Sequence, residues 1–386
     1  MQQETLATGA MPDATARPNF LLVARHDYRT ERKAGCHFLV DELARIGHTR
    51  FFSCTFSRLS RFKGDTRLPL ADRANRVETT ANGVETYLWR TLIHPCRVPG
   101  ALAPLMNAYV RHYGSHVPET FARWIREADV ILFETGGPEL FHDLVKRLNP
   151  RAMLVYLCSD SFDAINPAPY VRELALRHAR SFDKIMVKSP LLARLFPPGS
   201  PVFLTSQGFD KAELRERRAS PFAGGVNLVS VGNMLFDPEV FRAAAPAFPD
   251  ATFHVIGGGP RAQGLADLPN VRLYGEMPFS DTLAYLQHAD AGLAPYGAGV
   301  EPYLADTSLK LGQYRVLGLP AVCPEAVTGG YPGRFGYNPG EADTVRAAVA
   351  AALAHGRFPG VDLPSWREVA LDMLRPPADP AAVRVA

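Results

Sequence analysis

The chain has 386 residues, of which 47% are hydrophobic and 21% are charged, and its formal net charge is +3. This composition is typical of a soluble globular protein large enough for two domains, and it excludes collagen-like, low-complexity and wholly disordered chains. Five scattered cysteines without a C-x-x-C pair indicate a reducing compartment, with neither a disulfide framework nor a zinc site. Residues 1–18 are polar and lack the apolar segment of a signal peptide, so we expect a disordered tail. No apolar run approaches the roughly 18 residues that span a bilayer.

The first half of the chain alternates apolar strands with helices. Strands are predicted at 19–24, 49–53, 83–89, 129–133, 152–157, 184–188 and 201–204, and helices at 33–45, 101–127 and 139–148, with another beginning at Ser189-Pro190. Such alternation predicts an α/β fold with a mainly parallel, doubly wound sheet.

The second half repeats this pattern. Strands are predicted at 227–231, 251–256, 271–274 and 291–296, and helices at 239–247, 280–288 and from about Asp306 to a Gly-Pro stop before another strand. We therefore predict two Rossmann-like domains, 19–208 and 209–363, facing a central cleft, with a tail of residues 364–386 that can return to the first domain. Ligands of such sheets lie beyond the carboxyl ends of the strands.

The segment Tyr303–Pro324 is the most informative of the chain. Lys310 and Gln313 are three residues apart near the predicted helix start, so they share a face, and a cation there suits a diphosphate. A second face, suited to packing on a sheet, carries Leu309, Val316 and Leu317. The alternative is a surface helix with an exposed lysine.

Asp160 directly follows the predicted strand 152–157. A carboxylate at this edge can take a proton from an attacking hydroxyl. The alternative is that Asp160 caps a helix beginning near Phe162, because Asp is a favoured N-cap. Asp163 is the second candidate.

Other strand ends offer weaker candidates. Glycine-rich turns at 232 and 257–259 match neither the dinucleotide fingerprint nor the P-loop, which disfavours a dinucleotide oxidoreductase and a P-loop kinase. Glu276 and Met277 could meet a base or ribose, and Tyr296 could stack or hydrogen bond, although ordinary loop and core roles fit equally well. His26 and Arg29 end the first strand. We find no metal-ligand constellation and no D-x-D pair.

Residues 17–76 hold 13 Lys and Arg against 6 Asp and Glu. Within them, aromatic and leucine side chains interleave a basic run that comprises Arg50, Arg58, Arg61, Lys63 and Arg67. Such a surface can meet an anionic membrane or a phosphorylated ligand, or it can simply be solvated. No nucleic-acid motif accompanies it, so nucleic acid is not expected as a partner.

Several of these segments together resemble one family. They are His26-Asp-Tyr-Arg-Thr, Ser57-Arg-Leu-Ser-Arg with its continuation to Leu70, Tyr87-Leu-Trp-Arg-Thr with His94-Pro95, Gly232-x-Met-Leu-Phe-Asp-Pro-Glu239, Phe253-His-Val-Ile-Gly257, Tyr274-Gly-Glu-Met277, Tyr303-Leu-Ala-Asp-x-Ser-x-Lys310 and Arg334-Phe-Gly-Tyr-x-Pro-Gly340. Over about residues 18–345 the chain resembles the xanthan-type glucuronosyltransferases, glycosyltransferase family 70, which have the two-domain GT-B fold.

The resemblance implies an inverting, metal-independent and cofactor-free transfer of glucuronic acid from UDP-glucuronate in exopolysaccharide biosynthesis. The implied acceptor is a mannose of a polyprenyl-diphosphate-linked oligosaccharide, at the cytoplasmic face of the bacterial inner membrane, where the protein would be peripheral. Asp160 would be the general base, and the residues at the donor would be Asn233, Met234, Glu276, Met277, Tyr296, Lys310 and Gln313. Those facing the acceptor or the anionic membrane would be His26, Arg29, Arg58, Arg61 and Lys63, with the stretch 101–113.

Three segments depart from the family pattern: Asn233 replaces an expected Ser, Cys158 an expected Ala, and Ser206-Gln-Gly-Phe-Asp210 an expected Gly-His-Gly-Val-Asp. The last change bears on the floor of the cleft and on donor choice. Three alternatives therefore stay open: a GT-B enzyme using another UDP-sugar, a retaining GT-B enzyme, and a non-catalytic sugar-nucleotide or membrane-binding protein.

Overall fold

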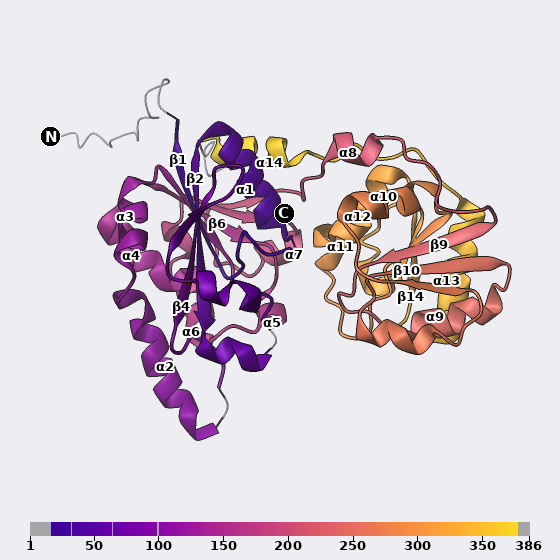
Figure 1. Ribbon diagram of the computed structural model, residues 1–386, viewed down its shortest axis with the longest axis horizontal. Helices are drawn as coiled ribbons and strands as arrows, with labels where there is room; N and C mark the ends of the chain where they lie inside the picture. The colour runs from indigo at the N-terminus through magenta and orange to yellow at the C-terminus, as the bar shows by residue number, and fades with distance from the viewer. Residues whose placement is uncertain (1–16, 32, 64, 99, 377–386) are drawn as a thin grey trace. The chain divides into compact units, whose positions relative to one another are not determined.

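The computed structural model describes residues 17–31, 33–63, 65–98 and 100–376, with the side chain of Lys63 excepted. The predicted disordered tail lies outside this range, apart from its last two residues. The chain divides into two compact units, of which unit 1 comprises residues up to 205 together with those from Trp366 onward, and unit 2 comprises residues 206–365 (Figure 1).

Unit 1 is built on an eight-stranded sheet in the order β3-β4-β2-β1-β5-β6-β7-β8. The strands are β1 (Asn19–Ala24), β2 (His48–Ser57), β3 (Val77–Thr79), β4 (Glu85–Thr91), β5 (Val130–Glu134), β6 (Met153–Cys158), β7 (Lys184–Val187) and β8 (Val202–Leu204). All neighbours pair in parallel except β3, which is an antiparallel edge strand. The central strands β1, β5 and β6 are mainly apolar, with polar residues such as Asn19 and Glu134 at their ends, because helices cover both faces of a parallel sheet.

The α-helices of unit 1 are α1 (Gly35–Ile46), α2 (Ala103–His112), α3 (Glu119–Glu127), α4 (His142–Leu148), α5 (Phe162–Ile165), α6 (Pro169–Arg177), α7 (Pro190–Ala193) and α14 (Trp366–Leu374). Helix α14 comes from the carboxyl-terminal end of the chain and packs on α1, where the rings of Trp366 and Phe38 stack 5.4 Å apart. Lys184 on β7 donates to the carbonyl of Met373 in the same helix. The last helix therefore belongs to unit 1.

Unit 2 has a six-stranded, wholly parallel sheet in the order β11-β10-β9-β12-β13-β14. Its strands are β9 (Val226–Val231), β10 (Ala251–Ile256), β11 (Val271–Tyr274), β12 (Ala291–Leu293), β13 (Ala321–Pro324) and β14 (Arg334–Tyr337). Its helices are α8 (Lys211–Arg215), α9 (Glu239–Ala244), α10 (Phe279–His288), α11 (Leu304–Thr307), α12 (Leu309–Leu317) and α13 (Ala342–His355). The prediction of an α/β fold with two doubly wound parallel sheets is confirmed.

Three local predictions were wrong. The predicted helix 101–127 is broken between α2 and α3, where Pro118 precedes the first turn of α3. The predicted strand 291–296 ends at Leu293, because Pro295 has no N–H to continue the ladder. Strands β3 and β14 were missed, since short edge strands carry little periodicity. Within the described residues, no helix is both long and apolar enough to cross a membrane.

Candidate functional site

Loops at the carboxyl edge of the unit 2 sheet bring the predicted donor residues together. Asn233 and Met234 follow β9, and the Cβ that a side chain would add at Gly259, after β10, would come within 3.1 Å of the Asn233 amide. Gly259 has a φ of +69°, so both its conformation and its neighbour require glycine there. Glu276, which follows β11, lies against Gly257. The loop after β9 is joined to the loop after β12 by a hydrogen bond from the N–H of Asp237 to the carbonyl of Pro295.

Lys310 lies in the first turn of α12. Its Nζ atom is buried and, among the described residues, has no hydrogen-bond partner; the ring centroid of Tyr296 is 5.3 Å away. Burial lowers the pKa of Lys310 to about 7. Burying an amine without a hydrogen-bond partner costs free energy unless an anion binds it. The Nζ of Lys310 is therefore the strongest sign of an anionic ligand in unit 2.

The helix start at Lys310 differs from the prediction. The chain forms the short helix α11 and then starts α12 afresh, with Ser308 as N-cap accepting from the N–H of Leu311. The Oγ1 atom of Thr307 just before the cap is buried and lacks a hydrogen-bond partner in the described structure. Unpaired polar groups therefore flank an amino terminus that already favours anions.

The packing face predicted for this helix was only partly right. Val316 is buried as predicted, but Leu309 and Leu317 are only partly buried. The fully buried residues of the helix are Leu311 and Tyr314. The Tyr314 ring lies so close to Gly292 on β12 that an added Cβ would come within 2.6 Å of it. An aromatic side chain and a glycine thus set the face that meets the sheet.

Tyr296 is a core residue. Its side chain is fully buried, and its hydroxyl bonds the Oγ of Ser308 at 2.8 Å. The core role that the sequence left open as an alternative therefore fits this conformation, in which Tyr296 supports the cap of α12 and lies beside Lys310. Gln313 and Met277 are partly buried, and Glu276 and Met234 are exposed.

Gln207, in the segment that departs from the family pattern, lies beside the same helix start. It is buried, and its Nε2 donates to the carbonyl of Thr307 at 3.2 Å. Its Oε1 finds no partner in the described part of the chain. The segment 206–210, which departs from the family pattern, therefore contacts the site around Lys310. Gln207 and Thr307 are 100 residues apart in sequence, so the sequence alone did not show this contact.

In unit 1, Asp160 lies between β6 and α5. The N-cap of α5 is Ser161, whose Oγ accepts from the N–H of Ala164 at 3.0 Å. The alternative reading of Asp160 as the cap is therefore wrong. Asp163 lies within α5 as an exposed residue paired with Arg172.

Ionisable side chains stand at or just after the ends of four neighbouring strands, β1, β5, β6 and β7. These residues are His26, Glu134, Asp160 and Lys188. The Nε2 of His26 lies 3.8 Å from an oxygen of Glu134, whose carboxylate is almost buried. Burial lowers the pKa of Lys188, and the negative charge of Asp160 partly offsets this. Sequence reasoning missed Glu134 and Lys188, although each ends or follows a buried strand.

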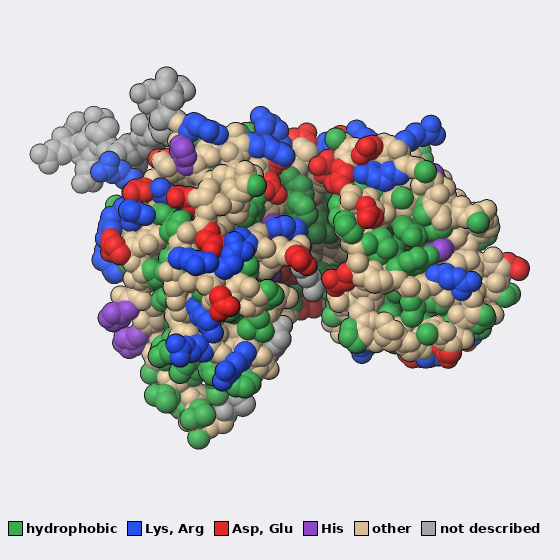
Figure 2. Space-filling view, viewed as in Figure 1, with side chains coloured by type: hydrophobic (Ala, Val, Ile, Leu, Met, Phe, Trp, Pro, Cys, Tyr) green, Lys and Arg blue, Asp and Glu red, His purple; other side chains and the backbone are tan. Residues whose placement is uncertain are grey.

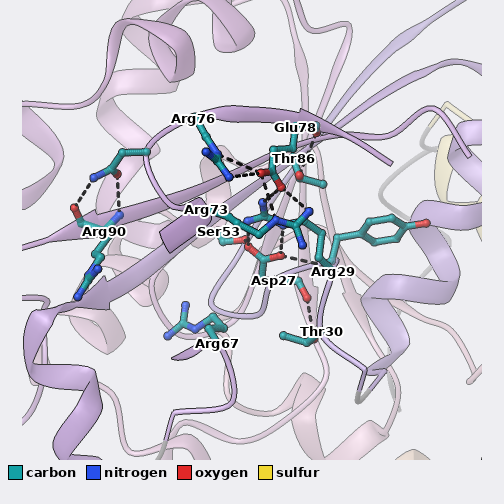
Figure 3. A network of polar contacts seen from close by, with 12 residues as sticks. Asp27, Arg29, Thr30, Ser53, Arg67, Arg73, Arg76, Glu78, Thr86 and Arg90 are labelled. Atoms are coloured by element: carbon teal, nitrogen blue, oxygen red, sulfur yellow. Dashed lines mark hydrogen bonds and ion pairs between the residues drawn. The ribbon is translucent and has the colours of Figure 1, made fainter. Parts of the chain in front are cut away.

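Arg29 belongs to a buried network rather than to a surface (Figure 3). Its side chain is only 5% exposed and pairs with Asp27 at 2.9 Å and with Glu78 at 2.6 Å. Burial alone would raise the pKa of Asp27, but its bonds with Arg29 lower it below the usual value. This arrangement favours a structural role for Arg29 over the acceptor contact that the sequence indicated.

The basic run divides by burial into two groups. Arg50 pairs with Glu85 and Glu127, and Arg67 pairs with Asp65, so both are structural. Arg58 and Arg61 are exposed on the 3-10 helix η1 (Arg58–Lys63). The side chain of Lys63, the remaining predicted contact, lies outside the described residues.

Exposed apolar side chains adjoin these two arginines. The loop after β4 bonds both the end of β2, which directly precedes η1, and α2: His94 bonds Ser57, and the carbonyl of Ile93 accepts from the hydroxyl of Tyr109. Figure 2 shows apolar side chains at the lower tip, where Figure 1 places α2. We name the basic-apolar surface by its exposed members: Arg58, Leu59, Arg61, Phe62, Leu92, Ile93, Leu102 and Leu105.

Comparison with known sequences gives concordant matches. Residues 22–188 match the family described as glucuronosyltransferase GumK, N-terminal domain. The chain is 45% identical over 379 residues to the UDP-glucuronate:glycolipid 2-beta-glucuronosyltransferase of Xanthomonas campestris pv. campestris. The matched region covers 97% of this chain and 94% of that relative.

Solved structures share the fold at low sequence identity. One is Anabaena Alr3699/HepE in complex with UDP and glucose, with a TM-score of 0.56, 13% identity and coverage of 92% of this chain and 95% of that one. Another is the E. coli trehalose-6-phosphate structure bound with UDP-2-fluoro glucose, with a TM-score of 0.55, 11% identity and coverage of 92% and 94%. These likenesses show the GT-B fold.

Proposed function

This chain belongs to the xanthan-type glucuronosyltransferases, and we propose that it transfers glucuronic acid from UDP-glucuronate to a mannose of a polyprenyl-diphosphate-linked oligosaccharide. The observation that carries the donor half of this proposal is the buried Nζ of Lys310 without a hydrogen-bond partner among the described residues. A UDP-sugar brings a diphosphate, which is the anion that this amine and the α12 amino terminus together favour.

Lys310 anchors the diphosphate and stabilises the charge that grows on it as the sugar leaves. The N–H groups of the first turn of α12 add further donors to the same oxygens. The loops after β9, β10 and β11 surround the nucleoside and sugar with Asn233, Met234, Glu276 and Met277. We expect no metal requirement, because a cation and oriented N–H groups supply the positive charge.

Asp160 acts as the general base in this proposal. The acceptor hydroxyl oxygen attacks the anomeric carbon, and its proton passes to the Asp160 carboxylate. The bond from the anomeric carbon to the diphosphate oxygen breaks, and its electron pair leaves on UDP. Attack opposite the leaving group inverts the anomeric centre. Ser161 supports this role because it caps α5 and so relieves Asp160 of that task.

The basic-apolar surface of unit 1 faces an anionic membrane in this proposal, which places the protein peripherally at the cytoplasmic face of the inner membrane. Phe62, on the same 3-10 helix as Arg58 and Arg61, is 72% exposed, and Leu105 on α2 is 71% exposed. Apolar side chains that enter the lipid boundary and arginines that meet anionic headgroups are the two contributions of interfacial binding. A lipid-linked acceptor would then lie in the same membrane to which the enzyme binds.

The test is a transfer assay with purified protein in EDTA, using UDP-glucuronate or UDP-glucose with a mannose-terminated, lipid-linked acceptor. We expect a β-linked glucuronosyl product from UDP-glucuronate alone. Transfer from UDP-glucose instead would overturn the donor, and an α-linked product would overturn the inverting mechanism. Binding of UDP-sugar without turnover on any acceptor would support the non-catalytic alternative.

A further inference from the structure

A second polar cluster lies in unit 1 between α4 and α6, where the proposed transfer reaction uses no residue. His142 is the first residue of α4, Asp143 follows it, and His178 is the C-cap of α6. One Asp143 oxygen, Oδ1, lies 3.1 Å from the Nδ1 of His142 and 3.5 Å from the Nε2 of His178. The two imidazoles and the carboxylate thus converge on one point.

Ser181 determines which nitrogen of His142 carries the proton. Its hydroxyl donates to the carbonyl of His178 at 2.7 Å, and that oxygen can only accept. The second contact of the same hydroxyl, with the Nε2 of His142 at 2.7 Å, must therefore be donated by the imidazole. In a neutral His142 the proton is on Nε2, and the Nδ1 lone pair faces the carboxylate of Asp143.

Three potential ligand atoms then face one another: the Nδ1 of His142, the Oδ1 of Asp143 and the Nε2 of His178. The Nε2 of His178 is buried and makes no hydrogen bond with any described residue. A cation at this point could take all three atoms as ligands.

We propose that His142, Asp143 and His178 bind one divalent transition-metal ion of the zinc class. Metal–nitrogen and metal–oxygen bonds of about 2.0–2.2 Å place the donor atoms of a tetrahedral site roughly 3.3 Å apart, which matches the two distances to Asp143. Two neutral imidazoles select zinc, copper or nickel over magnesium and calcium. The Ser181 contact orients His142 as outer partners of metal-ligating histidines do.

One rearrangement accompanies binding. The two imidazole rings stack 3.9 Å apart at an interplanar angle of 15°, so one ring must tilt for both lone pairs to meet the same ion. His178 is the ring that can move, because it is partly exposed whereas His142 is buried. The ion would join the start of α4 to the end of α6, so its effect is on the stability of unit 1.

The test uses protein without a histidine tag, stripped with EDTA and titrated with Co²⁺, a spectroscopic substitute for zinc. We expect one equivalent to give visible absorption bands, which Zn²⁺ abolishes by displacement, and we expect Zn²⁺ to raise Tm. His178→Ala and, separately, the exposed Asp143→Asn should each weaken affinity by at least tenfold, since each removes a ligand. His116→Ala, which removes another exposed histidine of unit 1, should bind as the unaltered protein does.

Two results would overturn the proposal. One is the absence of bands and of a Tm shift with a molar equivalent of metal. The other is binding that His178→Ala, Asp143→Asn and His116→Ala all leave unchanged, which would mean an adventitious ion only. The transfer assay in EDTA is independent of both results, so failure of this site and failure of the proposed function are distinguishable.

Discussion

The Nζ atom of Lys310 lies 5.3 Å from the centroid of the Tyr296 ring, while the hydroxyl of Tyr296 bonds Ser308, the N-cap of the same helix. One buried tyrosine therefore holds both the helix start and the cation that projects from it. The face of an aromatic ring attracts an ammonium ion without neutralising it. Lys310 is in this way kept in place and left available to an anionic ligand.

Replacing Lys310 by Ala should weaken UDP binding by about ten- to a hundredfold, because a charge-assisted hydrogen bond contributes about 1.5–3 kcal/mol. Isothermal titration calorimetry with UDP measures this change. The matched control is Lys211→Ala, which removes a lysine of the same unit that pairs with Asp362. Equal UDP affinity of the Lys310 variant and the unaltered protein would remove Lys310 from the diphosphate site.

Binding of UDP-glucuronate should weaken as pH rises through about 7. Burial lowers the pKa of Lys310 to about 7, so the amine is charged below that pH and neutral above it. A bound diphosphate favours the charged amine and therefore raises the pKa of Lys310 in the complex. Between the pKa of the free protein and the higher pKa of the complex, affinity should fall by up to about tenfold per pH unit. The donor is the right probe because its diphosphate, esterified at both ends, does not titrate in this range. Lys310→Met should bind UDP-glucuronate more weakly, with an affinity that does not change with pH near 7. A pH dependence that persists in this variant would implicate another titrating group.

Asp160→Asn should reduce kcat by at least a hundredfold and leave UDP affinity unchanged, since an amide cannot accept the proton of the acceptor hydroxyl. Asp163→Asn is the control, because Asp163 is exposed and only three residues further along unit 1. Measuring kcat with saturating donor, together with UDP binding, separates catalysis from folding. Near-normal turnover of the Asp160 variant would refute the base assignment.

Arg29→Ala should destabilise unit 1 by about 3–5 kcal/mol, because it leaves the fully buried carboxylate of Asp27 without its charged partner. Arg73→Ala removes a half-exposed partner of the same Glu78 and should cost at most about 1 kcal/mol. Urea unfolding of both variants measures the difference in free energy. Equal stabilities would mean that the network contributes little and would reopen a surface role for Arg29.

Exchange of Arg58 and Arg61 for Glu should reduce association with anionic phospholipid vesicles by at least tenfold, since each basic residue near such a surface contributes about 1 kcal/mol. The effect should shrink as salt is added, because the surface charge is screened. Arg346→Glu, an exposed exchange on unit 2, is the control. Vesicle binding that is absent at low salt, or the same in all variants, would contradict the membrane surface in the proposal.

Much of the fold was predictable because its signals are local. The alternation of apolar strands with helices predicted both sheets, and Ser189-Pro190 marked the start of α7. The predictions failed where contacts distant in sequence decide. The buried face of α12 follows from Tyr314 packing against Gly292, which helical periodicity alone does not contain.

The sequence by itself determined the two-domain α/β class, the resemblance to one family and the placement of Asp160 and Lys310 near strand ends and helix starts, because these follow from periodicity and motif spacing. Only the tertiary structure decided which arginines are buried, that Tyr296 supports Lys310, and that His178 lies beside His142. Burial and convergence depend on which segments pack together, and residues 36 positions apart meet only once α4 and α6 have packed.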